Sequence, residues 1–173
     1  ILYMFRSRTK QPDLLSNIDL EFIASMIGIP LQGVYSKDEL IDVEPEPNKC
    51  YIVNLEDSTL GGSHWVGVVI NETYVSYFDS FGVRPSDDVK EFISRYVKNQ
   101  DMETIYSLKQ IQHVDSVLCG YYVLYFCYFH MVLHSEDDDN KRLMNKHNKL
   151  YVDIFNLKFN DKIIQKLIKN IIV

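Results

Sequence analysis

The chain has 173 residues, of which 46% are hydrophobic and 24% are charged. This composition excludes intrinsic disorder, and the length predicts a single domain over residues 1–173. The formal net charge of −6 argues against a general nucleic-acid binder, which needs a basic surface to release counterions. Three cysteines, Cys50, Cys119 and Cys127, are too few for a secreted disulfide framework, so we expect a reducing compartment.

The first half of the chain predicts one helix followed by strands. In chain order we expect a peripheral segment at 1–15, a helix at 16–27, an acidic loop at 36–49, a strand at 50–55 and hairpin strands at 64–70 and 73–79. Ser16 has the hydroxyl of a typical N-cap, and Gly28 is suited to ending the helix.

The second half predicts more helix than strand. We expect a helix at 86–98, a strand at 103–108, a buried helix at 116–134, an acidic loop at 136–139 and a helical tail within 135–173. Residues 117–133 carry no charge from Asp, Glu, Lys or Arg, but this stretch is just short of a membrane span and includes Gly120 and His130. We therefore predict a buried core helix and no membrane partner. No signal-peptide pattern is visible at the start of the chain.

A histidine and an aspartate flank the predicted hairpin. If residues 71–72 form a two-residue turn, Ile70 pairs with Thr73. In an antiparallel hairpin the numbers of paired residues have a constant sum, so His64 then pairs with Asp79. Opposed side chains on antiparallel strands lie on one face with Cβ atoms about 4.5–5.5 Å apart. A carboxylate at that distance orients an imidazole and stabilises its protonated form, as a catalytic histidine requires. The alternative is a chance cross-strand pair.

Trp65, which follows His64, is the only tryptophan of the chain. In the same register Trp65 lies on the opposite face of the hairpin, across from Phe78. A buried tryptophan is usually a packing anchor, so core packing is favoured over direct substrate contact.

A cysteine opens the predicted buried helix. Asp115 or Ser116 is a suitable N-cap, which places Cys119 in the first turn, where the helix dipole favours a thiolate. Gly120 leaves room for a substrate backbone. The upstream Gln112 has an amide that can donate to a developing oxyanion.

Other cysteines and histidines have plainer interpretations. A buried inert thiol is the commoner fate of a cysteine in an apolar helix, and we assign it to Cys50 and Cys127. Cys127, His130 and His134 share one helix face, a possible zinc set with His147 as a fourth ligand, but the closed tetrahedral shell is not supplied. His113, beside Gln112, is interpreted as an exposed loop residue.

Together these residues resemble a known protease pattern. The motifs are Gly61-Gly62-Ser63-His64-Trp65, Tyr77-Phe78-Asp79-Ser80-Phe81-Gly82, Gln112, and Asp115-Ser116-Val117-Leu118-Cys119-Gly120. Over residues 16–134 the chain resembles the adenain family, the maturation cysteine proteases of adenoviruses, and more distantly the proteases that process and remove ubiquitin-like modifiers. The Lys-, Ile- and Asn-rich composition further favours the virophage and Polinton-type branch.

The resemblance implies an α+β fold with papain-like cysteine protease architecture of adenain type. A central mixed β-sheet is packed by helices, with the nucleophile at the N-terminus of a buried central helix. It implies Cys119 as nucleophile, His64 as general base and acid, Asp79 as the residue that orients it, and Gln112 with the Cys119 backbone N–H as oxyanion hole. It also implies substrate contacts at Gly62, Trp65 and Gly120.

The implied activity is an endopeptidase that cleaves capsid precursors, near glycines, in the virion or the infected cell. The alternative is a protease that deconjugates or processes a ubiquitin-like modifier. Two departures from adenain matter. Residues 100–111 contain no cysteine for disulfide-linked activation, and the acidic chain predicts no DNA cofactor. We expect a monomer with no cofactor and no metal.

Overall fold

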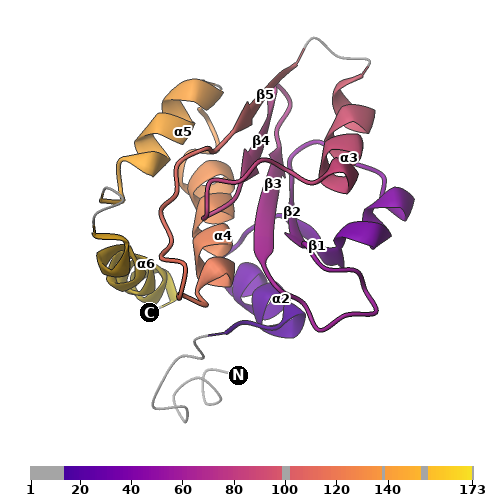
Figure 1. The fold of residues 1–173 in the computed structure, drawn as a ribbon. Coiled ribbons are helices and arrows are strands. Elements are labelled where there is room, and N and C mark those ends of the chain that lie inside the picture. The colour runs from indigo at the N-terminus through magenta and orange to yellow at the C-terminus, as the bar shows by residue number, and fades with distance from the viewer. Residues whose placement is uncertain (1–13, 99–101, 138, 153–155, 173) are drawn as a thin grey trace.

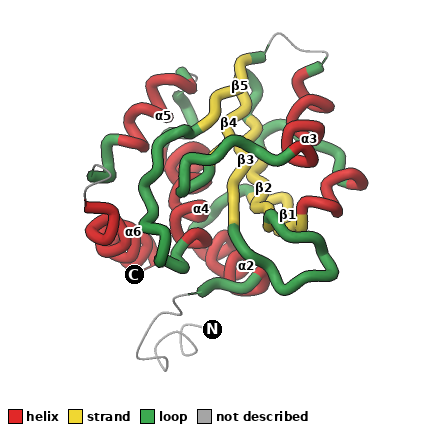
Figure 2. Tube along the Cα trace, in the orientation of Figure 1, coloured by secondary structure: helices red, strands yellow, loops and turns green. Residues whose placement is uncertain are grey.

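A five-stranded sheet forms the centre of the molecule (Figures 1 and 2). The computed structural model describes residues 14–98, 102–137, 139–152 and 156–172, so most of the expected peripheral segment at 1–15 lies outside the described residues. The strands are β1 (Leu31–Ser36), β2 (Lys49–Asn54), β3 (Trp65–Ile70), β4 (Tyr74–Phe78) and β5 (Glu103–Tyr106). They lie side by side in chain order, with parallel pairs at the two edges and antiparallel pairs in the middle. The predicted mixed sheet is confirmed.

Helices cover both faces of the sheet (Figure 1). They are α2 (Asn17–Met26), the 3₁₀ helix η1 (Lys37–Asp42), α3 (Asp87–Val97), α4 (Cys119–Tyr128), the π-helical turn η2 (Phe129–Leu133), α5 (Asn140–Asn148) and α6 (Leu157–Ile172). The sequence did not predict β1 or η1, since residues 36–49 were expected to form only a loop. No helix within the described ranges combines the length and apolar character that crossing a bilayer requires.

Successive side chains of the strands point into two hydrophobic cores, one on each face of the sheet. On one face, residues such as Ile52 and Phe78 pack against α2, α4, α5 and α6. On the other face, residues such as Tyr51 and Tyr77 pack against α3 and η1. This alternation is the period-two pattern of strands that are buried on both sides. The central strands therefore have little freedom to move, and both ends of the β3–β4 hairpin are held in place.

The hairpin register differs from the predicted one. Gly67 pairs with Phe78, where a two-residue turn would have paired it with Ser76. The reason is an Asx turn: the Asn71 side-chain oxygen accepts from the backbone N–H of Thr73 at 2.9 Å, which lengthens the loop. A displacement of two residues keeps each side chain on its own face, so the predicted facing of the hairpin side chains survives.

The partner predicted for Trp65 was also wrong. Trp65 pairs with Asn54 of β2, while Phe78 lies opposite Gly67. Trp65 still packs, partly buried, against the core on the α4 face, which includes Phe78. The favoured packing role is thus seen, although through different neighbours.

The buried helix begins three residues later than its expected start at 116. The first residue of α4 is Cys119 and its N-cap is Leu118, not Asp115 or Ser116. The Ser116 hydroxyl instead accepts from the Leu118 backbone N–H at 3.3 Å, which turns the chain into the helix. The delay brings the thiol closer to the positive end of the helix dipole than predicted.

Candidate active site

His64 and Asp79 meet at the end of the β3–β4 hairpin. The Nε2 atom of His64 lies 2.8 Å from Oδ1 of Asp79. Asp79 is 1% exposed and the His64 side chain is 11% exposed. The pairing of β3 with β4 runs only as far as Gly67 and Phe78, so the two side chains meet beyond the paired strands and not as directly opposed strand residues. The predicted pairing is therefore present, by a different geometry.

Phe81 holds the histidine ring in place. The rings of Phe81 and His64 stack with centroids 4.6 Å apart. The Phe81 backbone N–H donates to Asp79 Oδ1 at 2.7 Å, so the same carboxylate oxygen is held from two sides. The imidazole consequently has one ring nitrogen committed to Asp79 and the other, Nδ1, available.

Cys119 and Asp79 are the side chains that act on the His64 imidazole. Burial alone would lower the pKa of His64, but hydrogen bonding and charge from Asp79 and Cys119 outweigh burial and raise it to about 9. The imidazole is therefore protonated at neutral pH. Cys119 itself is 4% exposed and is the first residue of α4.

Gln112 is fixed by both ends of its amide. The Ser80 hydroxyl donates to its Oε1, and its Nε2 donates to the Ser116 carbonyl at 2.7 Å. The backbone N–H groups of Ile111 and Gln112 both donate to the Ser80 carbonyl at 2.9 Å. These bonds turn the amide nitrogen toward the segment that leads into Cys119 and leave a second N–H on Nε2 for another acceptor.

The four residues 79–82 tie the histidine and the glutamine together. Asp79 and Phe81 act on His64, while Ser80 acts on Gln112. Gly82 has φ +71°, and a Cβ there would lie 2.7 Å from the backbone nitrogen of Gln110. Only glycine allows this close approach of the turn to the segment that carries Gln112.

The C-terminal helix braces the same segment. Asn160 of α6 donates to the Ile111 carbonyl at 2.8 Å. Its neighbour Asp161 accepts from the hydroxyls of Ser116 at 3.0 Å and Tyr122 at 2.9 Å. The predicted helical tail therefore contains a support for the Gln112 segment, a role that the sequence did not indicate.

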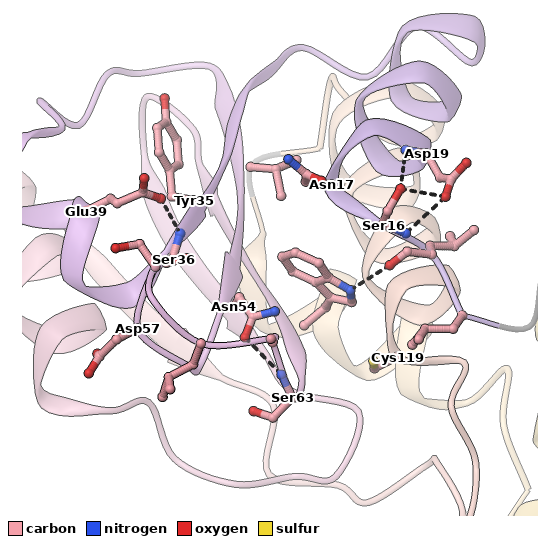
Figure 3. A pocket seen from close by; sticks show the side chains of 18 residues that line it. Ser16, Asn17, Asp19, Tyr35, Ser36, Glu39, Asn54, Asp57, Ser63 and Cys119 are labelled. Atoms are coloured by element: carbon pink, nitrogen blue, oxygen red, sulfur yellow. Dashed lines mark hydrogen bonds between the residues drawn. The ribbon is translucent and has the colours of Figure 1, made fainter.

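A groove of about 590 Å³ opens at Cys119 (Figure 3). It is lined by Leu14, Leu15, Ser16, Asn17, Asp19, Val34, Tyr35, Ser36, Glu39, Asn54, Asp57, Ser58, Leu60, Gly61, Gly62, Ser63, Trp65 and Cys119. Two of the three residues expected to contact substrate, Gly62 and Trp65, are in this lining. The Trp65 indole N–H donates to the Leu15 carbonyl at 3.1 Å, which holds the ring between core and groove.

Gly120, the third expected contact, lies elsewhere. It is buried, and a Cβ added to it would lie 3.2 Å from atoms of Leu15 and Leu20. The missing side chain therefore makes room for the segment leading into α2 and for α2 itself. It does not make room for a substrate backbone, and the expectation for Gly120 is corrected on this point.

The remaining thiols and histidines lie apart from this site. Cys50 and Cys127 are fully buried free thiols. Within the part of the chain that the structure describes, no three His, Cys, Asp or Glu residues are grouped to hold a metal ion. His130 and His147 are instead packed among aromatic rings.

Sequence reasoning missed the residues that support the site. Ser80 and Phe81 belong to the motif at residues 77–82, but their roles depend on contacts with residues distant in sequence. Asn160 had no sequence signal beyond being a polar residue on an otherwise apolar helix face, where its side chain is fully buried. A buried asparagine on a helix face normally indicates a backbone partner elsewhere in the fold.

Comparisons with known proteins bear on the family and the fold of the chain. A family model described as "Ulp1 protease family, C-terminal catalytic domain" matches residues 51–166, which include all four candidate catalytic residues. The ASFV pS273R protease has a similar fold, with 14% identity and a TM-score of 0.52 over 81% of this chain and 68% of that one. Its selenomethionine form aligns with 14% identity and a TM-score of 0.46, over 80% and 68%. A search of curated proteins found no match.

Proposed function

The chain belongs to the Ulp1 protease family and is a cysteine protease, and from that premise we propose that Cys119, His64 and Asp79 carry out peptide-bond cleavage. The observation that carries the proposal is the buried His64–Asp79 pair of 2.8 Å beside a helix-terminal thiol. Such a pair supplies a nucleophile, a proton carrier and a group that orients the carrier.

The reaction follows from the arrangement of atoms. The Cys119 thiolate attacks the peptide carbonyl carbon, and the oxyanion accepts hydrogen bonds from the Gln112 amide and the Cys119 backbone N–H. Because Nε2 of His64 is committed to Asp79, Nδ1 gives its proton to the leaving amine. A thioester remains. Nδ1 then takes a proton from water, which attacks the thioester and releases the carboxylate product and the thiol.

The family favours one of the two expected substrate classes. Membership of the Ulp1 protease family supports a protease of a ubiquitin-like modifier over one of a capsid precursor. The glycines at 61 and 62, with Trp65, line the groove at Cys119 and suit a modifier tail of small residues. We therefore propose that the protein cleaves after the C-terminal glycines of a folded modifier.

The capsid precursor is the second candidate. The similar fold of an ASFV protease is the observation that favours it. If this candidate is correct, we propose that the protein is of the adenain type, in the virophage branch, and that it acts in a virion or an infected cell. Action as a monomer without DNA is proposed for both candidates.

A pair of fusion substrates separates the candidates. One carries a ubiquitin-like modifier ending in Gly-Gly and joined to a reporter, and the other carries a capsid-derived sequence in the same place. We expect the wild type and Cys127→Ala to cleave the modifier fusion after the glycines, and Cys119→Ala to leave it intact. Cleavage of the capsid fusion alone would select the second candidate. Cleavage by Cys119→Ala would refute the proposed nucleophile.

A further inference from the structure

The groove beside Cys119 is lined by charges of one sign. Among the described residues, its lining includes three carboxylates, Asp19, Glu39 and Asp57, and no Lys or Arg. Figure 3 shows Asp19 on one wall, while Glu39 and Asp57 lie across the groove on the other. A cleft with charges of one sign concentrates ligands of the opposite charge and speeds their association. The groove therefore favours positively charged chains.

Within the part of the chain that the structure describes, one weak ion pair is the only salt bridge to these three carboxylates. Asp19 and Glu39 each accept hydrogen bonds from a serine three residues earlier, and these donors are neutral backbone N–H and hydroxyl groups. Asp57 lies 3.5 Å from Lys37, but both side chains are substantially exposed, where an ion pair is weak. The three carboxylates thus remain sources of negative potential along the groove.

An amide donor in the groove, on Asn54, indicates which backbone group a ligand would place there. Asn54 ends β2, lines the groove and is only 7% exposed. Its Oδ1 accepts from the backbone N–H groups of Glu56 at 2.9 Å and Ser63 at 3.2 Å. Among the described residues its Nδ2 makes no hydrogen bond, and in Figure 3 the nitrogen points away from Ser63.

Gly62 keeps that donor uncovered. A Cβ at Gly62 would lie 2.6 Å from Asn54 Nδ2, so any side chain there would collide with the amide. Asn54 Nδ2 is not one of the fully buried unpartnered atoms of the described residues, so it faces the groove, where a ligand acceptor can take its hydrogen bond in place of water. An extended peptide supplies such an acceptor in each backbone carbonyl.

We propose that the groove binds an extended, positively charged peptide segment of the substrate, with Asn54 Nδ2 donating to its backbone and Glu39 and Asp57 selecting its Lys or Arg side chains. This proposal rests on the proposed function, because the segment is the part of the substrate that leads to Cys119. It adds a charge preference that the family assignment does not contain.

Peptide binding tests the proposal without requiring cleavage. The probes are short fluorescent peptides of Gly and Ala that carry Lys, Gln or Glu at the same alternate positions. Binding to the full chain with Cys119→Ala is measured by fluorescence anisotropy. We expect the Lys peptide to bind about tenfold more tightly than the Gln peptide at low salt, with the Glu peptide weakest and the differences shrinking as salt is raised. Equal affinities for the Lys and Glu peptides would overturn the proposal.

Charge-matched variants separate the groove from the overall charge. Glu39→Gln with Asp57→Asn removes two groove charges, and Asp88→Asn with Glu91→Gln removes two charges from exposed positions of α3. We expect only the groove pair to abolish the Lys preference, with all variants retaining the wild-type melting temperature. If both pairs reduce the preference equally, the proposal is wrong.

Asn54→Asp tests the amide donor. Asp retains the oxygen that accepts from Glu56 and Ser63, loses the N–H donors and adds a negative charge, so the neutral Gln peptide is the probe. We expect the neutral Gln peptide to bind roughly fivefold more weakly to this variant. An unchanged affinity would remove Asn54 from the proposal. The fusion assay above is independent of these measurements, so cleavage without charge preference refutes only the groove, and charge preference without cleavage refutes only the protease mechanism.

Discussion

Replacing Asp79 by Asn tests the coupling between the carboxylate, the imidazole and the thiol. Asn is nearly isosteric with Asp and keeps an oxygen that accepts from the Phe81 backbone N–H. It removes the negative charge 2.8 Å from His64 Nε2. The variant therefore changes the proton affinity of the histidine with little change in packing.

The expected size of the effect of Asp79→Asn follows from the pKa of His64. Its rise from 6.5 to about 9 is caused by Asp79 and Cys119 together, against the opposing effect of burial. At about 1.36 kcal/mol per pKa unit, the rise corresponds to about 3 kcal/mol in favour of the protonated imidazole. Losing most of it would reduce the protonated fraction at pH 8 at least tenfold. Loss of the correct tautomer adds to this, and asparagine at a catalytic aspartate has cost about 10⁴-fold in a serine protease.

The assay is the pH dependence of kcat/KM on the fusion substrate, together with the rate of Cys119 alkylation by iodoacetamide. We expect wild-type activity to fall as pH rises through about 9, where the imidazolium loses its proton. In Asp79→Asn this fall moves toward pH 7. Asp115→Asn is the matched control, since Asp115 lies 3.6 Å from His113 at an exposed position. An alkaline limb that stays in place in Asp79→Asn would refute the coupling.

The same pair links folding to pH. Because the folded pKa of His64 is raised, its contribution to the free energy of unfolding is complete below pH 6.5 and is lost as pH rises through about 9. Urea unfolding should therefore show Asp79→Asn less stable than the wild type by up to about 3 kcal/mol at pH 6, and the gap should narrow at pH 10. A gap that is constant from pH 6 to pH 10 would contradict this linkage.

Three further perturbations follow from the contacts around the site. Ser80→Ala removes the hydroxyl that donates to Gln112 and should lower kcat about tenfold with KM little changed; an equal rise in KM would speak against positioning. Asp161→Ala removes the acceptor for two hydroxyls and should lower the free energy of unfolding by about 1–3 kcal/mol in urea, together with kcat. Burial lowers the pKa of His147 to about 3, so its contribution to stability falls as pH drops below 6.5. Between pH 6.5 and pH 5 the wild type should lose about 2 kcal/mol of unfolding free energy through His147, and His147→Phe should not show this loss. Urea unfolding at both pH values measures the difference.

Local patterns in the sequence were sufficient for most of the helices and strands. Ser16 caps α2 through a reciprocal bond with Asp19, and Ser86 caps α3, because capping depends on residues three positions apart. Runs rich in Val, Tyr, Ile and Phe located β3 and β4. The strand β1 was missed because its central Gly33 and polar Gln32 weaken the pattern, and its pairing with β2 supplies the order.

The candidate site was predicted in part for a similar reason. His64 and Asp79 are close in sequence, and a displacement of the register by two residues leaves side chains on the same face. The two were therefore predicted correctly as neighbours although the predicted turn was too short. Gly120 was assigned to substrate contact because a glycine beside a nucleophile indicates open space. What fills that space is α2 and the residue before it, which the sequence around Gly120 does not contain.

By itself the sequence determined the residue types and the order in which they occur: an acidic chain, one cysteine at a helix start, and a histidine and an aspartate on one hairpin. Such features depend on short-range periodicity and on the chemistry of single side chains. The tertiary structure decided which distant groups support them. Ser80 reaches Gln112, and Asn160 reaches the Ile111 carbonyl from the last helix, because packing of helices on the sheet brings these segments together. It also shaped the groove, where Asn54, Glu39 and Asp57 gather from separate elements. Long-range packing selects such contacts, and no local pattern encodes it.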